Sequence, residues 1–313
     1  MSKVFALAVV SALFGGSAAL AQYNLEASQN SWQSVGSGSI FNNDYLGEMR
    51  DRWQTASTTY SMVRGYGWDG DLPDAPGEIV EYRIQGRIIA PGDVENPVPG
   101  DRLYSTSYSL GTHTHFNYGA NEVSLGADLV ITGEQTGLPA LQTAIHNELG
   151  RDVPSDATLA DMIPDGVHPG VVVELGRPMY LSNTAELRPF AELRTGDETL
   201  FRSGVDVYFG GIVENDLLVR DQVTGQRYRT ARGDNLPGLG FVVGGDIAQM
   251  GNSIYFPSDR GPDMIDNRTR LRAGVMWQGD SNSVFYGMTW LSEEFDTQPE
   301  PQFVGSIRLK FEF

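Results

Sequence analysis

The feature that most constrains this chain is a repeated alternation of apolar and polar side chains with a period of two residues. Between Val80 and Ile88, for example, apolar residues alternate with charged or amide residues such as Glu81 and Arg83. Successive side chains of a β-strand point to opposite faces, so this pattern predicts strands with one apolar and one polar face. The same alternation recurs in residues 122–131, 201–209, 271–278, 284–290 and 306–313.

The number of alternating segments predicts about twelve strands, within the range of single-chain membrane barrels. A soluble sandwich also alternates. Here the polar face is strongly charged, as a lumen can be, and Tyr, Trp and Phe lie near strand ends, as in interfacial girdles. A last strand ending in an aromatic residue, Phe313, is typical of outer-membrane barrels. The predicted strands are 34–42, 57–68, 78–90, 102–117, 119–132, 171–181, 184–194, 200–212, 239–249, 268–279, 282–293 and 302–313.

The start of the chain predicts export. Lys3 gives a short positive end, and residues 4–14 form an apolar run that is too short to span a bilayer as a helix. Ala19-Leu20-Ala21 then supplies the small residues at which signal peptidases cleave. We therefore predict a signal peptide at residues 1–21 and one all-β domain, a transmembrane antiparallel β-barrel of the bacterial outer membrane, at residues 22–313.

Composition narrows the choice of partners. The chain has 40 acidic and 22 basic residues, a formal net charge of −18, and no cysteine. Nucleic-acid binding needs basic surface, so we expect no nucleic-acid partner. Carboxylates are hard oxygen ligands, which makes a divalent cation a plausible partner. We expect a monomer surrounded by outer-membrane lipids.

The connections between the predicted strands alternate between short turns and longer outer loops. With the C-terminus on the periplasmic side, the outer loops are residues 43–56, 91–101, 133–170 and 250–267. One connection departs from this rule, because residues 213–238 fall on the periplasmic side but are long. A missed strand in that segment is one explanation.

The longest outer loop is predicted to contain a short helix. Its apolar residues recur at helical spacing before Gly150, which can end a helix. Gln142 and His146 are four residues apart and therefore share a helix face. Taken alone, this spacing favours a helix packed on the barrel rim. The apolar residues are Leu138, Leu141, Ile145 and Leu149.

Two further groups of residues have both a structural and a functional interpretation. Asn43-Asp44 in the first outer loop suits an ordinary turn, or a cation site with Asp44 as the hard ligand. His113 and His115 share the lumen face of one predicted strand. Two such histidines can bind a metal, but we interpret them as polar lumen residues.

These motifs resemble those of the outer-membrane lipid A 3′-O-deacylases, twelve-stranded barrels that remove an acyloxyacyl chain from lipopolysaccharide. The family places an Asn-Asp pair at the end of its first strand, which Asn43-Asp44 matches. It then has Asp-Arg, two residues, and a Thr that enters the second strand. The matching residues here are Asp51-Arg52-Trp53-Gln54-Thr55.

The resemblance continues in the later loops. After the fifth strand the family has a Gly, then a Gln, three residues, a His, and a Gly four residues further on. Pro99-Gly100-Asp101-Arg102 resembles the family's entry into the fourth strand, although residues 91–99 contain no counterpart of its basic loop residue. The residues that match the later motif are Gly133, Gln142, His146 and Gly150.

The resemblance implies a calcium-assisted carboxylic ester hydrolase acting on lipid A of lipopolysaccharide. His146 would be the general base, since an imidazole normally titrates near neutral pH. Asn43 and Asp44 would hold Ca²⁺, which polarises a carbonyl or a water as a Lewis acid. Gln142 and Thr55 would orient the water or the oxyanion. The implied catalytic residues are therefore His146, Gln142, Thr55, Asn43 and Asp44.

Two alternatives remain open from the sequence. The first is a non-catalytic outer-membrane barrel, either a channel or a structural protein, which the charged lumen face suits. The second is a phospholipase-type esterase, which uses a Ser and a His on strand faces. No Ser near a His forms a comparable pattern along this chain.

Overall fold

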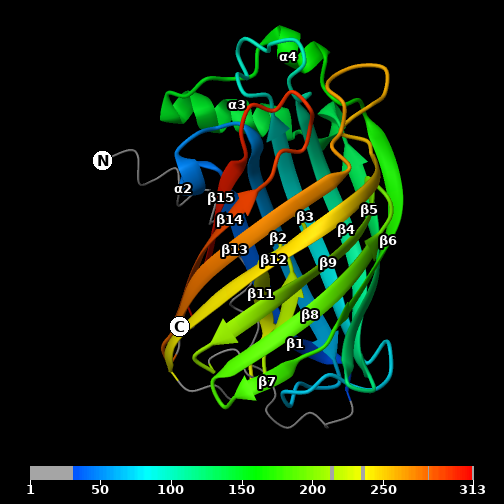
Figure 1. Cartoon of the computed structure of the whole chain (residues 1–313), viewed down its shortest axis with the longest axis vertical. Helices are drawn as coiled ribbons and strands as arrows, with labels where there is room; N and C mark the ends of the chain where they lie inside the picture. The colour runs from blue at the N-terminus through cyan, green and yellow to red at the C-terminus, as the bar shows by residue number, and fades with distance from the viewer. Residues whose placement is uncertain (1–30, 212–214, 234–236, 281, 312–313) are drawn as a thin grey trace.

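A computed structural model describes residues 31–211, 215–233, 237–280 and 282–311. The predicted signal peptide and Phe313 lie outside these residues. Twelve antiparallel strands form a closed barrel, which confirms the predicted fold class. Pairing of β1 with β15 and of β6 with β8 closes it (Figure 1). The wall strands are β1 (Gln33–Asn43), β2 (Trp53–Gly65), β3 (Ile79–Ala90), β4 (Ser105–Tyr118), β5 (Asn121–Thr132), β6 (Gly166–Gly176), β8 (Ala185–Arg194), β9 (Glu198–Phe209), β12 (Gly238–Ser253), β13 (Asn267–Gln278), β14 (Asn282–Leu291) and β15 (Gln302–Phe311).

Short helices gather at one end of the barrel, which we call the helix end (Figure 1). All four predicted outer loops emerge there, and the predicted loop helix is α3, closed by Gly150 at φ +64°. The β8–β9 turn and the β14–β15 loop also lie at the helix end. The opposite end, the turn end, carries the other connections and a short strand, β7 (Met179–Ser182), beside β8. Within the described residues, no helix is long and apolar enough to cross a membrane. The helices are α2 (Tyr45–Glu48), η1 (Glu134–Thr136), α3 (Leu138–Leu149) and α4 (Asp156–Ala160).

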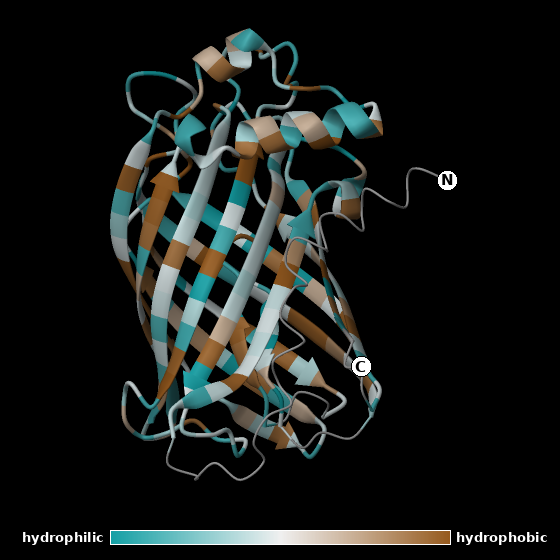
Figure 2. Cartoon of the chain, turned by 180° about the vertical axis from the view of Figure 1, so that it is seen from behind, coloured by the Kyte–Doolittle hydropathy of each residue, from teal (hydrophilic) through white to brown (hydrophobic). Residues whose placement is uncertain are grey.

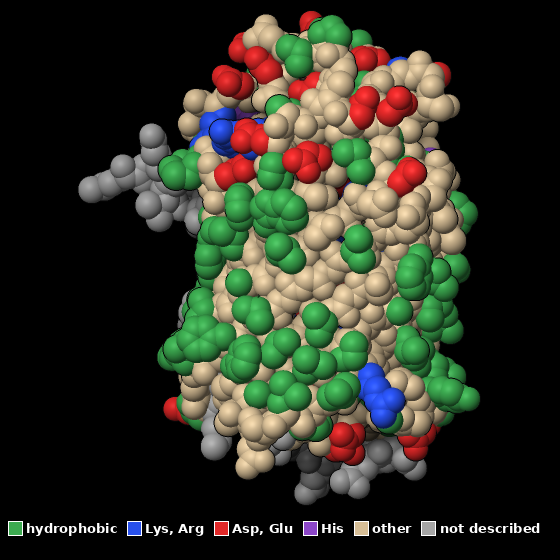
Figure 3. Space-filling view, viewed as in Figure 1, with side chains coloured by type: hydrophobic (Ala, Val, Ile, Leu, Met, Phe, Trp, Pro, Cys, Tyr) green, Lys and Arg blue, Asp and Glu red, His purple; other side chains and the backbone are tan. Residues whose placement is uncertain are grey.

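The predicted alternation places polar side chains inside and apolar side chains outside. On β3, Glu81 and Arg83 are buried in the lumen, whereas Tyr82 between them is 42% exposed. Figure 2 shows the alternating hydropathy along the strands, and Figure 3 shows hydrophobic side chains spread over the outer wall. Asp and Glu side chains gather instead at the helix end in that view. The apolar outer surface is the one that lipid tails contact in such barrels.

The largest boundary error concerns β6, which begins at Gly166 rather than at residue 171. The segment around Pro169 contains Gly and Pro, so its sequence is typical of a loop. In the structure it pairs with β5, from Thr132↔Gly166 to Asp128↔Gly170. The β8 pairing starts only at Val172, so Pro169 lies where no second neighbour requires a backbone donor.

The long connection between β9 and β12 is a hairpin inside the lumen and not a periplasmic loop. Its strands are β10 (Leu217–Arg220) and β11 (Arg227–Ala231), and β11 lies against β1. A Cβ on Gly36 or Gly38 would lie about 2 Å from a backbone oxygen of β11, so only glycine permits this approach. Alternation did not reveal β10 because all four of its residues are buried.

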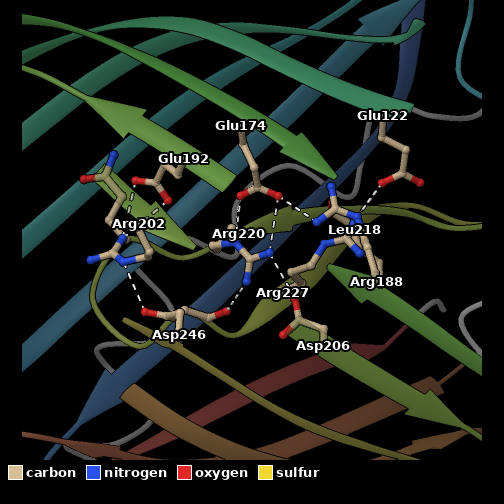
Figure 4. Close-up of polar contacts among 12 residues, drawn as sticks. Glu122, Glu174, Arg188, Glu192, Arg202, Asp206, Leu218, Arg220, Arg227 and Asp246 are labelled. Carbon is tan, nitrogen blue, oxygen red and sulfur yellow. Dashed lines mark hydrogen bonds and ion pairs between the residues drawn. The ribbon is translucent and has the colours of Figure 1, made fainter. Parts of the chain in front are cut away.

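Ion pairs fix this lumen hairpin to the wall (Figure 4). Arg220 contacts Glu174 of β6 at 2.7 Å and Asp206 of β9 at 2.9 Å. Arg227 of the hairpin lies 3.5 Å from Glu122 of β5. Buried charges are tolerated only when they are paired, so the charged wall and the hairpin depend on each other. A polar cavity of about 320 Å³ remains between them.

The turn of the hairpin reaches the wall just below the helix end. The Asp221 side chain is fully buried and accepts hydrogen bonds from Asn42 of β1, at 3.0 Å, and from Thr59 of β2, at 3.2 Å. Gln85 of β3 donates to it as well, at 3.3 Å. Asn42 directly precedes Asn43-Asp44, so the hairpin supports the strand end that carries this motif.

We expect Asp221→Ala to destabilise the barrel by about 3–5 kcal/mol, because breaking a buried polar network leaves its partners without hydrogen bonds. Asp74→Ala, which changes an exposed aspartate at the turn end, is the matched control and leaves stability nearly unchanged. Urea unfolding of both variants in detergent or lipid measures the difference. Equal midpoints for the two variants would contradict the supporting role of the hairpin.

Candidate active site

The residues of the two motifs meet at the helix end. β1 ends at Asn43, and Asp44 immediately precedes α2. Thr55 lies near the start of β2, while α3 carries Gln142 and His146 on its buried face. All five residues that the sequence predicted for the site are therefore at the same end of the barrel.

Backbone geometry joins Asn43, Asp44 and Thr55 into one unit. The Asp44 backbone N–H donates to the Thr55 carbonyl at 3.2 Å, and the side-chain amide of Asn43 donates to the same carbonyl at 2.9 Å. The Asn43 side-chain oxygen accepts from the Tyr45 N–H at 2.9 Å, which begins the turn into α2. The Asn-Asp pair thus has a structural function in addition to the predicted one.

Asp44 is a carboxyl group in an unusual setting. It is fully buried, and its Oδ2 accepts from the Arg52 N–H at 2.6 Å. Its Oδ1 has no hydrogen-bond partner among the described residues. Burial raises the pKa of Asp44 to about 9, and the charges of Asp51 and Glu48 add to that rise. A cation at Oδ1 would offset these effects, so the residue fits the predicted calcium ligand.

The other residues that would bind Ca²⁺ are less well defined than Asp44. Among the residues that the structure describes, no group of three or more His, Asp and Glu side chains is arranged to hold a metal ion. Ca²⁺ also accepts backbone carbonyls, amide oxygens and waters as ligands. Calcium therefore stays a prediction that rests on Asn43 and Asp44.

His146 has both ring nitrogens engaged. Nδ1 lies 2.5 Å from the backbone carbonyl of Asp152, and a carbonyl only accepts, so Nδ1 carries the proton. Nε2 lies 3.3 Å from Oδ2 of Asp51. Burial raises the pKa of Asp51, while His146 and Arg151 oppose that rise. With the proton on Nδ1, a neutral His146 faces the Asp51 carboxylate with a second acceptor, so this contact is a hydrogen bond only when Nε2 or Asp51 carries a proton. A charged Asp51 therefore stabilises the imidazolium that forms when Nε2 gains a proton.

Gln142 is held by a residue from the barrel wall. The Tyr104 hydroxyl donates to its Oε1 at 2.6 Å. Its Nε2 is buried and has no hydrogen-bond partner in the described part of the chain. The Thr55 hydroxyl is buried as well, and its interaction with Asp51 opposes the rise in the pKa of that carboxyl. Buried polar atoms are normally paired. Unpaired atoms on Asp44 and Gln142 together indicate a position for a water, an ion or a substrate group.

Sequence reasoning assigned no role to two residues that belong to this site. Asp51 was visible only as part of the Asp-Arg motif, and nothing in the sequence pattern marked Tyr104. The charge of Asp51 acts on Asp44, His146 and Tyr104, so it lies centrally among them. Burial and this charge both raise the pKa of Tyr104, which keeps the phenol protonated.

His113 and His115 lie in the lumen, as interpreted from the sequence. His113 contacts Asp128 at 3.0 Å and His115 contacts Glu81 at 2.9 Å, all in the lumen. His168 lies near the start of β6, where its Nε2 is 3.3 Å from the Thr132 hydroxyl.

Comparison with known proteins supports the barrel fold. No protein-family model and no curated protein sequence matches the chain. The solved structure of LpxR from Salmonella typhimurium is similar, with a TM-score of 0.71 and 16% identity over 90% of this chain and 100% of that one. The NanC porin (TM-score 0.41, 6% identity, 89% and 100%) and the KdgM porin (0.40, 5%, 88% and 99%) are more distant. The protein has the closed barrel fold of LpxR and is a β-barrel of the bacterial outer-membrane type.

Proposed function

We propose that the protein is an outer-membrane ester hydrolase that removes the 3′-linked acyloxyacyl chain from lipid A. The observation that carries the proposal is the His146–Asp51 pair, with Nδ1 of His146 bound to the Asp152 carbonyl. Beside it lies the unpaired side-chain nitrogen of Gln142. The fold likeness to LpxR, a lipid A 3′-O-deacylase, supports the substrate class.

The arrangement suits attack by water. Nε2 of His146 takes a proton from a water molecule whose oxygen attacks the ester carbonyl carbon. Asp51 stabilises the resulting imidazolium by its negative charge. N–H groups of Gln142 stabilise the oxyanion of the tetrahedral intermediate. The intermediate then expels the sugar oxygen, which receives the proton from His146, and the fatty acid leaves.

Two neighbouring side chains could bind the calcium ion that this scheme includes. Asp44 Oδ1 and the Asn43 side-chain oxygen would hold the ion, and the acidic neighbours Asp51 and Glu48 favour a cation there. A bound Ca²⁺ would supply Lewis-acid polarisation of the ester carbonyl.

The position of the site suits a lipid substrate. We propose that the helix end faces the outside of the cell, where lipopolysaccharide occupies the outer leaflet. Tyr45 and Met49 are exposed beside the site, at 42% and 72% of their surfaces, and Leu141 of α3 is 40% exposed. Apolar side chains at this end can contact acyl chains, and the Asp and Glu side chains that gather at the helix end would then face the head groups.

The channel alternative is less well supported. The lumen hairpin occupies the barrel interior, and its buried Arg220 pairs with Glu174 of β6 and Asp206 of β9. An open pore would instead leave such charges in contact with water. The phospholipase-type alternative shares the ester chemistry and differs in the lipid that is cut.

Mass spectrometry of defined lipid A, incubated with the purified folded protein and Ca²⁺, tests the proposal. The expected product has lost the 3′-linked acyloxyacyl chain. A glycerophospholipid incubated in parallel distinguishes the phospholipase alternative, and ion conductance in a planar bilayer distinguishes the channel. Lipid A recovered intact under conditions in which either alternative gives a signal would refute the deacylase assignment.

We expect Asp51→Asn to lower kcat for lipid A deacylation by about 10- to 100-fold, because the imidazolium loses its negative partner. Asp161→Asn is the matched control, since Asp161 is an exposed aspartate at the same end that forms an ion pair with the exposed Arg260. Steady-state kinetics with defined lipid A measures both variants. Equal kcat values for Asp51→Asn and the wild type would remove Asp51 from the mechanism.

A further inference from the structure

Tyr104 connects the barrel wall with the helix that carries the proposed catalytic residues. It lies one residue before β4 and is 1% exposed, with its ring packed among Ala90, Val94 and Met162. This packing holds the ring against α3. From there, the hydroxyl donates to Oε1 of Gln142 at 2.6 Å.

This single contact decides how the Gln142 amide is oriented. The phenolic proton has no other hydrogen-bond acceptor in the described part of the structure. The amide therefore turns its oxygen toward Tyr104, and its planar geometry directs the NH₂ group the opposite way. That NH₂ group is buried and unpaired, so its two N–H donors are unused.

We propose that Tyr104 is a positioning residue that presents the N–H donors of Gln142 to the oxyanion formed during ester hydrolysis. The inference rests on the proposed function. Donors help an oxyanion most when their direction is set before the reaction, because no reorganisation is then needed. A glutamine without such a partner would rotate about its terminal bond and present oxygen or nitrogen alternately.

Kinetics of three variants with defined lipid A test this function. Tyr104→Phe keeps the ring and removes only the hydroxyl, and we expect kcat to fall about 10- to 100-fold with KM changed less than about twofold. Gln142→Ala removes the donors, and we expect a loss of about 10²–10³-fold. The double variant should be no slower than Gln142→Ala, because Tyr104 acts only through Gln142.

Tyr228→Phe is the matched control. It also removes one buried hydroxyl hydrogen bond, the 2.7 Å contact with Ser61, but it does so in the lumen hairpin. Its kcat should equal that of the wild type. A wild-type kcat for Tyr104→Phe, a rise in KM alone, or additive losses in the double variant would each overturn the inference.

NMR of the Gln142 side-chain amide in detergent separates this inference from the proposed function, because it needs no substrate. We expect a restrained amide in the wild-type protein and an averaged one in Tyr104→Phe. An inactive wild type with that amide difference would refute the deacylase assignment and leave the positioning function intact. Identical amide signals in the two proteins would overturn the positioning function whatever the activity.

Discussion

His146→Ala is expected to abolish lipid A deacylation while the barrel still folds. General base catalysis typically contributes about 10²–10⁴-fold, and the loss is larger if His146 also holds the attacking water. His146 belongs to α3, which lies outside the wall, so the substitution removes no strand pairing. Release of fatty acid from defined lipid A measures the activity, and heat-modifiable migration on a gel reports the folded barrel.

The matched control for His146 is His168→Ala. His168 is a half-buried histidine near the same end, and its ring contacts the Thr132 hydroxyl. His113 and His115 are poorer controls, because they are buried and paired with Asp128 and Glu81. Near-normal turnover in folded His146→Ala would mean that the helix only packs on the rim, and the proposed enzyme would be without its base.

Asp44→Asn and removal of Ca²⁺ are expected to have equivalent effects. Asparagine has nearly the same size and still accepts from the Arg52 N–H, but it lacks the charge that would hold the ion. Metal polarisation supplies several kcal/mol of transition-state stabilisation, so each change should lower kcat by about 10²-fold or more. Rates measured in excess chelator, and again after Ca²⁺ is restored, provide the comparison.

Two further measurements make the calcium prediction specific. Asp156→Asn, an exposed aspartate in α4, should keep both its activity and its dependence on Ca²⁺. Asp44→Asn in excess chelator should be no slower than Asp44→Asn alone, because both changes remove the same ion. Wild-type protein that works at its full rate in excess chelator would contradict the calcium prediction directly.

The fold was predictable from the sequence because a barrel wall obeys a local rule. Each strand has one face toward lipid and one toward the lumen, so residues such as Tyr82 and Arg83 reveal their environments by position alone. The rule fails where a segment has no lipid-facing side. Both strands of the lumen hairpin are mostly buried, and the arginines that fix it find their carboxylates on strands far away in the sequence.

The candidate site likewise has one part that the sequence predicted and another that only the structure shows. The sequence by itself determined which residue types stand at the ends of β1 and β2 and on one face of α3, because helical spacing puts Gln142 beside His146. Only the tertiary structure decided which side chains from separate segments meet. Asp51 reaches His146 from the first loop, and Tyr104 reaches Gln142 from the start of β4. Such contacts depend on where the closed barrel brings its strand ends together, which no local pattern encodes.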